Sequence, residues 1–399
     1  MKLPLLLDGA TGTRLMAAGM PPDVCPEQWI LDNPDSLISI QQGYVDAGCD
    51  VLYVPSFGAN RVCLNKYGLG DRVVEMNKRL AALTKGVIAD NPGRKVLVAG
   101  DMSPTGLLPL PWGDTPFEDY EKIYCEQATA LYEAGVDLIV CETMTNLTEA
   151  RAALSAARKT GLPVFVTVTV DKNGRTLSGG RLLPFVITLQ SMGAAAVGLN
   201  CSNGVSFMAG QLSEALPHAK VPLVAKPNAM DEQGELDPIR FSLEVQKLLD
   251  AGATIVGGCC GTSDKHIAAL RRILDSHPII APAQINANAC AVESEAFLLA
   301  DHIDTGELIP CDSDLADRLI QAELNSNVAL LSLTLPGDLD NLLEYGGMSR
   351  IPLALNTDSP ELLERALRIF PGRLLVDSMC EIDKQLIEDI AAKYGAIVF

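Results

Sequence analysis

Three cysteines are the residues of this sequence whose type and spacing best suit chemistry. Cys201 lies in Gly198-Leu-Asn-Cys-Ser, and Cys259 and Cys260 lie in Gly257-Gly-Cys-Cys-Gly-Thr. Each group follows a short run of small and apolar residues, which is typical of a buried strand. Three thiolates at one point form a zinc site whose fourth position is open to a substrate sulfur or to water. The alternative is that all three are small buried hydrophobic side chains, as free cysteines often are.

The backbone around the adjacent pair must be irregular if both side chains are to reach one metal. Successive side chains of a regular strand point to opposite faces of the sheet. Gly257, Gly258 and Gly261 supply the freedom that would turn both cysteines inward. Thiolates select zinc, and a thiol bound there gives up its proton near neutral pH. The other cysteines are interpreted as structural: Cys25, Cys49, Cys63, Cys125, Cys141, Cys290, Cys311 and Cys380.

A second group of residues could receive an α-amino acid. The motif Asp8-Gly-Ala-Thr-Gly-Thr follows the first apolar run, and backbone N–H groups beside glycines suit a carboxylate. Asp8 and Glu142, each at the end of a predicted strand, would bind the ammonium group. The predicted substrate-binding residues are Asp8, Gly9, Ala10, Glu142 and Asn200.

Two other interpretations of this group were weighed. A phosphate loop is disfavoured because Gly-Ala-Thr-Gly-Thr lacks the Gly-Lys-Ser/Thr pattern. The paired carboxylates could instead be a general acid and base. A transfer between sulfur and a carrier, however, needs little proton movement.

These residues need a scaffold in which strand ends converge. Short apolar runs alternate with helix-like segments, such as residues 120–134, 147–159 and 243–251, and eight such repeats favour a (β/α)8 TIM barrel. A doubly wound open sheet is the competing architecture, but no Gly-x-Gly-x-x-Gly follows the first strand. The predicted strands are residues 3–7, 51–54, 96–100, 138–141, 164–168, 195–199, 223–226 and 254–256.

Polar residues occur where these predicted strands stop. The carboxyl ends of the strands form the active-site face of such barrels. Any one of these residues could be a structural cap, but their convergence on one rim favours a functional site. They are Asp8, Ser56, Asp101, Glu142, Asn200, Cys201, Asn228, Cys259 and Cys260.

Composition narrows the class of protein. The chain has 399 residues, and its net charge of −19 argues against nucleic acid or an anionic membrane surface as a partner. No apolar run reaches the roughly 18 to 20 residues that span a bilayer. Clustered cysteines without an export signal indicate a reducing compartment, so a soluble cytoplasmic protein is predicted.

A second α/β unit follows a proline-rich link. The predicted domains are a barrel over 1–280, a linker over 281–289 and a partial, half-barrel-like unit over 290–399. Its predicted strands are residues 329–335, 351–355, 373–376 and 396–399, with helices over 360–369 and 384–393. A parallel sheet that stops on a bare strand exposes unpaired backbone groups. We therefore expect this edge to be covered by the barrel or by a second copy of the chain, which would make a homo-oligomer.

The order of the motifs resembles the homocysteine S-methyltransferase family. The first 280 or so residues are most similar to the N-terminal module of the cobalamin-dependent methionine synthases. This resemblance implies that Cys201, Cys259 and Cys260 hold Zn²⁺, that homocysteine binds at Asp8, Gly9, Ala10 and Glu142, and that its thiolate accepts a methyl group to give methionine. The motifs are Asp8-Gly-Ala-Thr-Gly-Thr, Ser56-Phe-Gly-Ala-Asn-Arg, Gly100-Asp-Met-Ser-Pro-Thr-Gly, Cys141-Glu-Thr, Gly198-Leu-Asn-Cys-Ser, Lys226-Pro-Asn-Ala and Gly257-Gly-Cys-Cys-Gly-Thr.

The second unit resembles about the first half of the pterin-binding module of the same enzymes. It departs from the pattern of that module at the strand ends, where the pterin would bind. Ser332 and Thr334 stand in the first such place, Asn356 stands where Asp is usual, and Asp377 stands where Asn is usual. With half the barrel absent as well, these departures argue against folate binding.

The methyl carrier is predicted to be a separate protein. A corrinoid module typically carries Asp-x-His-x-x-Gly, and the nearest match, Asp264-Lys-His266, has Ala269 in place of the glycine and is interpreted as a helix start. The favoured function is thus a zinc-dependent homocysteine methyltransferase that receives its methyl group from methylcobalamin on a corrinoid protein. One alternative uses a small donor such as a betaine or S-methylmethionine. Another is a degenerate, non-catalytic subunit of a corrinoid system.

Overall fold

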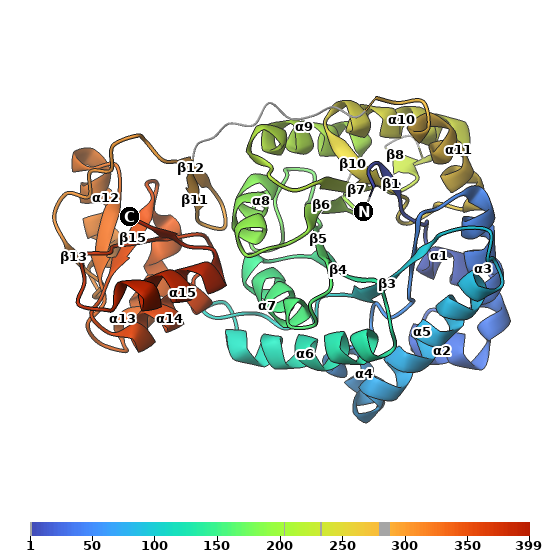
Figure 1. Ribbon diagram of the computed structural model, residues 1–399, viewed down its shortest axis with the longest axis horizontal. Helices are drawn as coiled ribbons and strands as arrows, with labels where there is room; N and C mark the ends of the chain where they lie inside the picture. The colour runs from blue at the N-terminus through green and yellow to red at the C-terminus, as the bar shows by residue number, and fades with distance from the viewer. Residues whose placement is uncertain (1, 203, 232–233, 279–287) are drawn as a thin grey trace.

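Eight parallel strands form the ring at the centre of the first unit (Figure 1). The computed structural model describes residues 2–202, 204–231, 234–278 and 288–399. The strand order around the ring is β1-β10-β7-β6-β5-β4-β3-β2, so the predicted TIM barrel is confirmed. The strands are β1 (Leu5–Leu6), β2 (Val51–Tyr53), β3 (Leu97–Met102), β4 (Leu138–Met144), β5 (Val164–Val168), β6 (Ala196–Asn200), β7 (Leu223–Lys226) and β10 (Ala253–Val256).

The ring closes between β1 and β2 through few bonds. Leu7 pairs with Val51 in an isolated parallel bridge, and the Asp50 N–H donates to the Leu6 carbonyl at 2.7 Å. The Asp50 carboxylate accepts from the Leu6 N–H at 2.8 Å and forms an ion pair with Arg271 at 3.0 Å. Asp50 therefore joins the first strand to the second at the closing seam.

Alternation of side chains along the strands builds two apolar layers. Leu5 and Leu7 point into the barrel with Phe165 and Val224, whereas Leu6 belongs to the larger core between strands and helices. The surrounding helices are α1 (Gly12–Ala17), α2 (Pro26–Asp32), α3 (Pro34–Ala47), α4 (Arg61–Asn65), α5 (Val73–Ala89), α6 (Phe117–Glu133), α7 (Leu147–Arg158), α8 (Leu182–Ser191), α9 (Val205–Ala215), α10 (Pro238–Asp250) and α11 (Asp264–Leu274). In the described part of the chain, none of the helices has the length and apolar character needed to cross a membrane.

Local signals explain where helices start. Asp237 accepts from the N–H groups of Ile239 and Arg240, with Pro238 in the first position of α10, so this helix begins earlier than predicted. Ser263 and His266 form a capping box at the start of α11. The sequence Asp264-Lys-His266 is therefore a helix start, as predicted. A short antiparallel hairpin, β8 (Met230–Asp231) and β9 (Gly234–Glu235), precedes α10.

The second unit is a five-stranded parallel sheet in the order β13-β14-β15-β16-β17. Its strands are β13 (Ile309–Pro310), β14 (Ala329–Ser332), β15 (Leu353–Asn356), β16 (Leu375–Val376) and β17 (Ile397–Val398), and its helices are α12 (Leu315–Asn325), α13 (Asp338–Tyr345), α14 (Pro360–Ile369) and α15 (Lys384–Tyr394). The extra α/β unit is confirmed, with four strands where predicted and β13 in addition. The predicted linker 281–289 lies outside the described residues except for its last two positions.

An antiparallel hairpin links the two units. It consists of β11 (Ala289–Ala291) and β12 (Ala296–Leu298), and it packs against α8 of the barrel. Ala291 also pairs with Arg373 just before β16. In its turn, the Glu293 carboxylate accepts from the Leu147 N–H at 2.6 Å and from the Ser178 hydroxyl at 2.5 Å. A residue of the second unit thus binds the start of α7 and a loop of the barrel.

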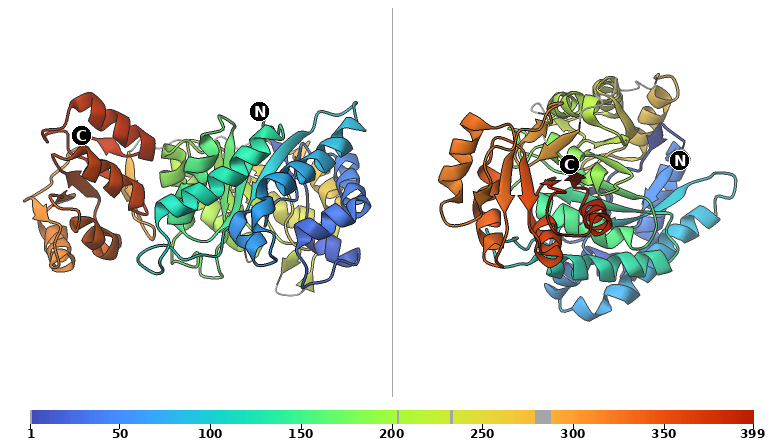
Figure 2. Two further views of the ribbon diagram at one scale, coloured as in Figure 1. Left: turned by 90° about the horizontal axis from the view of Figure 1, so that it is seen from below. Right: turned by 60° about the vertical axis from the view of Figure 1, so that its left-hand side comes forward.

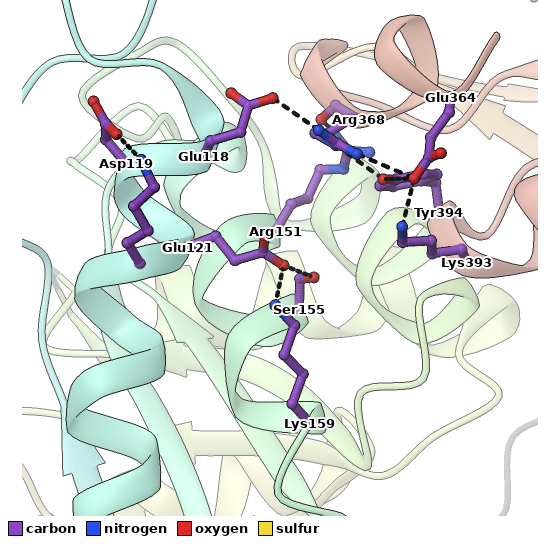
Figure 3. Close-up of polar contacts among 11 residues, drawn as sticks. Glu118, Asp119, Glu121, Arg151, Ser155, Lys159, Glu364, Arg368, Lys393 and Tyr394 are labelled. Carbon is purple, nitrogen blue, oxygen red and sulfur yellow. Dashed lines mark hydrogen bonds and ion pairs between the residues drawn. The ribbon is translucent and has the colours of Figure 1, made fainter. Parts of the chain in front are cut away.

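The second unit lies beside the outer helices α6, α7 and α8 of the barrel (Figure 2). Charged side chains make the second connection between the units there (Figure 3). Arg151 on α7 is fully buried and donates to the carbonyls of Leu367, Arg368 and Phe370 at the end of α14. Arg368 in turn forms an ion pair with Glu118 on α6 at 2.9 Å. The barrel therefore supplies the C-terminal cap of a helix in the second unit.

The edge strand β17 was expected to be covered. The barrel approaches it at Gly395, where an added Cβ would lie 2.3 Å from the Ser191 hydroxyl of α8. Ile397 and Val398 themselves are only half-buried. Coverage of this edge by a second copy stays a prediction.

Candidate functional site

The three cysteines of the sequence motifs come together at the carboxyl ends of β6 and β10. Their sulfur atoms all lie within 4.8 Å of one another, and the Sγ atoms of Cys201 and Cys260 are 3.8 Å apart. A tetrahedral zinc ion about 2.3 Å from each thiolate needs sulfurs about 3.8 Å apart. The donor set and its spacing therefore fit zinc, with the remaining coordination position left for another ligand.

The backbone is bent to bring these side chains inward. Cys201 has a φ of 53°, a left-handed conformation that is uncommon for a residue with a side chain. Its N–H donates to the Lys226 carbonyl at 3.1 Å. The Cys259 N–H donates to the Pro227 carbonyl at 2.8 Å. Both halves of the trio are thus fixed to the segment that follows β7.

Asn228 joins the two halves directly. Its side-chain amide donates to the Cys201 carbonyl at 3.4 Å, and its side-chain oxygen accepts from the Cys260 N–H at 3.1 Å. Thr262 plays a similar part on the other side, because its hydroxyl donates to the Cys259 carbonyl at 2.7 Å and accepts from the Ala10 N–H at 2.9 Å. Such supporting contacts orient metal ligands.

Hydrogen bonds among the thiols shift their pKa values in opposite directions. Hydrogen bonds from Cys201 and Cys259 lower the pKa of the Cys260 thiol far below its usual range. The pKa of Cys201 is raised, first by its hydrogen bond to Cys259 and then by that to Cys260. The arrangement of the trio therefore favours a negative charge on the Cys260 sulfur, and a thiolate is the form of cysteine that binds a metal cation.

A buried group of charges lies on the same rim. The Lys226 ammonium, at the end of β7, is 3.2 Å from Glu142 Oε2 and 3.9 Å from Asp8 Oδ1. It also lies 3.7 Å from the centre of the Tyr53 ring. The Tyr53 N–H donates to Asp8 Oδ2 at 2.8 Å, while Asp8 Oδ1 is buried without a hydrogen-bond partner among the described residues. Strands β1, β2, β4 and β7 thus bring two carboxylates and one ammonium together.

Burial and charge set the ionisation of this group. Burial raises the pKa of Asp8 to about 6, although the Lys226 ammonium opposes the shift. Burial likewise raises the pKa of Glu142 against the pull of Lys226, and the neighbouring Cys259 raises it further. Asp101 is raised well above its usual pKa by burial and then by Glu142. Because Cys259 acts on all three carboxyls, the thiol and carboxylate groups share one electrostatic environment.

The structure uses some predicted substrate residues for internal bonds. The Ala10 N–H is engaged by Thr262, and the Ala10 carbonyl accepts from the Tyr44 hydroxyl at 2.7 Å. A Cβ at Gly9 would lie 2.8 Å from that same hydroxyl, so this position has no room for a side chain. Both residues shape the turn beside Asp8.

Asn200 is also occupied. Its side-chain oxygen accepts from the Thr143 N–H and the Thr167 hydroxyl, both at 2.9 Å, and its amide donates to the Thr143 hydroxyl at 2.7 Å. Thr143 follows Glu142 directly and has a φ of 65°. Asn200 therefore holds the backbone next to Glu142 in place, and its contact with substrate stays a prediction.

Sequence reasoning placed Asn228 among the polar residues of the rim and Thr262 only within a motif, and it gave Lys226 no role. The sequence signal that could have identified Lys226 is its position at the end of the apolar strand β7. The strands on either side, β6 and β10, lead into Asn200 and into the cysteine motif. A lysine at the rim of a barrel reads as exposed, yet this one is buried.

Side chains at the strand ends of the second sheet form hydrogen bonds within the second unit. The Asn356 amide donates to Asp377 Oδ2 at 2.8 Å. The Thr334 N–H and hydroxyl both donate to Asp338 Oδ2, at the first residue of α13. Of the pterin-like positions, Asn356 and Asp377 thus bond each other, and Thr334 bonds the start of the next helix.

Comparison with known proteins places this site in a family. A family model described as homocysteine S-methyltransferase matches residues 5–274. The methionine synthase of Mycobacterium tuberculosis is 31% identical over 282 residues, which cover 65% of this chain and 24% of that protein. The methionine synthase of Mycobacterium leprae is 30% identical over 282 residues, covering 65% of this chain and 23% of that protein. The chain thus matches about a quarter of the length of these relatives.

Solved structures give the same fold. The homocysteine methyltransferase MmuM from Escherichia coli, in its metallated form, superposes with a TM-score of 0.56 at 24% identity, covering 67% of this chain and 95% of that one. Its oxidized form gives 0.57 at 25% identity, with the same coverage. The matched family model spans the barrel and every residue of the trio and of the charged group. This chain belongs to the homocysteine S-methyltransferase family.

Proposed function

We propose that this protein transfers a methyl group to the thiol sulfur of homocysteine, giving methionine, with Zn²⁺ held by Cys201, Cys259 and Cys260. The observation that carries the proposal is the thiol trio, with all sulfurs within 4.8 Å, in the same electrostatic environment as Asp8 and Glu142. A thiol ligand and an ammonium receptor on one barrel rim suit an amino acid that carries a thiol. Family membership supports the same substrate.

Different residues of the site would hold the metal ligands in place and bind the substrate. When bound, zinc would supply the Lewis acidity that lets a substrate thiol lose its proton near neutral pH. Asn228 and Thr262 hold the cysteine backbones in place, and Asp8 and Glu142 bind the substrate ammonium. The sulfur of homocysteine, as thiolate, then attacks the methyl carbon of the donor, and the electron pair of the breaking bond leaves with the donor.

The donor we propose is methylcobalamin on a separate corrinoid protein. The similarity to methionine synthases supports this choice, as does the second α/β unit after the barrel. A cavity of about 750 Å³ opens beside Cys201, between the loops that follow β5, β6 and β7. Ser202, Phe207 and Asn228 line it, so a donor could approach the trio from this side.

The test compares two cysteine variants. Cys259→Ala removes one ligand of the trio, whereas Cys125→Ala removes a half-buried cysteine on α6, away from the site. Zinc content and methyl transfer to homocysteine are measured with methylcobalamin, S-methylmethionine or betaine as donor. We expect C259A to lose both zinc and transfer, and C125A to keep both. Wild-type transfer from a small donor alone would replace the corrinoid proposal, and activity in zinc-free C259A would refute the zinc site.

We also propose that the predicted domains, 1–280 and 290–399, are the units of folding. The larger apolar clusters support this division, because each draws its residues from one unit. The cytoplasm is the proposed location, since all eleven cysteines are free.

A further inference from the structure

Lys226 is a cation placed inside the receptor for another cation. Its side chain is only 4% exposed, and its ammonium faces Glu142 at 3.2 Å, Asp8 at 3.9 Å and the face of Tyr53 at 3.7 Å. In the proposed function, these two carboxylates bind the ammonium group of homocysteine. A resident ammonium between them therefore has to be explained.

The net charge of the pocket explains why an ammonium lies between the two carboxylates. Two carboxylates and one ammonium leave the pocket with a single negative charge. Burial and the neighbouring Glu142 raise the pKa of the Asp101 carboxyl well above its usual range, which disfavours a further negative charge there. Buried charge is tolerated only when it is balanced. Asp8 Oδ1 is buried and has no hydrogen-bond partner among the described residues, so this carboxylate has an oxygen to present to a ligand.

We propose that Lys226 is a positioning residue that determines specificity: it cancels one of the two carboxylates and fixes Glu142, so that the pocket selects a thiol bearing one α-ammonium group. This inference rests on the proposed function and adds the origin of its selectivity. Lys226 acts through Glu142 and Asp8 and does not touch the thiol. Without it, two buried carboxylates would face each other with one ligand cation to share.

The experiment measures binding of two thiols to zinc-loaded protein by calorimetry. They are L-homocysteine and 4-mercaptobutyrate, which is homocysteine without its amino group. For Lys226→Met we expect about tenfold or greater loss of homocysteine affinity, because a buried charge loses its partner, while 4-mercaptobutyrate changes by about twofold or less. Lys122→Met is the control, since Lys122 on α6 is exposed and paired with Asp119, and it should bind both thiols like wild type.

A double variant gives the sharpest result. Glu142→Gln alone leaves Asp8 and Lys226 with no net charge, so homocysteine binding should fall. Adding K226M to E142Q restores a single negative charge, so removing the lysine should tighten homocysteine binding by about fivefold relative to E142Q. This comparison holds even if K226M alone does not fold.

Each outcome bears on one of the two proposals. K226M that binds homocysteine like wild type, or that loses both thiols equally at full zinc content, would overturn the role of Lys226. A double variant no tighter than E142Q would do the same. Wild-type protein that binds zinc but not homocysteine would instead overturn the proposed function.

Discussion

Replacing Arg151 tests whether the junction between the two units contributes to stability. Its guanidinium is buried and donates to three carbonyls at the end of α14, at 2.9 Å to Arg368 and 2.6 Å to Leu367, with Phe370 as the third. Burial lowers its pKa to about 10, so it stays charged at neutral pH. Arg151→Met keeps most of the side-chain length and removes every donor. The carbonyls of α14 would then be buried without partners.

The expected cost follows from these contacts. Each hydrogen bond from a charged donor contributes about 1.5–3 kcal/mol, and part of that is offset because the arginine no longer has to be desolvated. Breaking a buried charged contact by removing one partner typically costs about 3–5 kcal/mol, and we expect R151M to fall in that range. Lys159→Met is the control on the same helix. Its ion pair with Glu121 at 3.0 Å is half-exposed, and such pairs are worth about 0.2–1 kcal/mol (Figure 3).

Urea unfolding followed by circular dichroism measures the loss, and limited proteolysis reports which unit opens. We expect R151M to unfold at lower urea than K159M and to be cut first within the second unit. Arg151→Lys should be intermediate, because one ammonium cannot reach three carbonyls as the planar guanidinium does. If R151M and K159M have the same urea midpoint and the same cleavage rate, the junction contributes nothing and the reasoning is wrong.

Two further predictions concern the site. Burial raises the pKa of Asp8 to about 6, so its carboxylate is lost as pH falls through that value, and KM for homocysteine should rise below about pH 6. Asp8→Asn should raise KM at neutral pH and abolish this pH dependence. If KM of the variant still rises below pH 6 as in the wild type, Asp8 is not the group that titrates. Asn228→Ala removes the bridge between Cys201 and Cys260, so zinc affinity in a chelator competition should fall about 10- to 100-fold. Asn173→Ala, in an exposed turn, should leave zinc affinity unchanged. Equal zinc affinities in the two variants would show that the Asn228 bridge does not support the site.

Periodicity and strand ends were sufficient to predict the barrel. Each strand of the ring is a short apolar run flanked by glycine or polar residues, and both of its faces are buried, so the sequence contrast is strong. The cysteine trio could be predicted for the same reason, since it sits at two of those strand ends. Asp8 and Glu142 followed from the convergence of the rim.

Other features depend on contacts between distant segments and left no local signal. Arg151 lies in an alanine-rich helix, where an arginine is typical of an exposed face, and only the docking of α14 buries it. Lys226 is buried because carboxylates from two other strands surround it. Strand β13 was missed because it is two residues long and contains Pro310, which argues against a strand. The β11–β12 hairpin is short and directly follows the proline-rich link, so its pattern was not distinguished.

Glu293 has a consequence for the order in which the protein is made. The Leu147 N–H, which donates a hydrogen bond to Glu293, lies 146 residues earlier in the chain. As the chain leaves the ribosome, all the strands of the barrel are available before this carboxylate has been synthesised. The start of α7 and the loop at Ser178 must therefore wait for the hairpin of the second unit. This part of the barrel rim is completed by a residue outside the barrel, so synthesis up to the β11–β12 hairpin, rather than closure of the ring, marks the point at which its bonds can form.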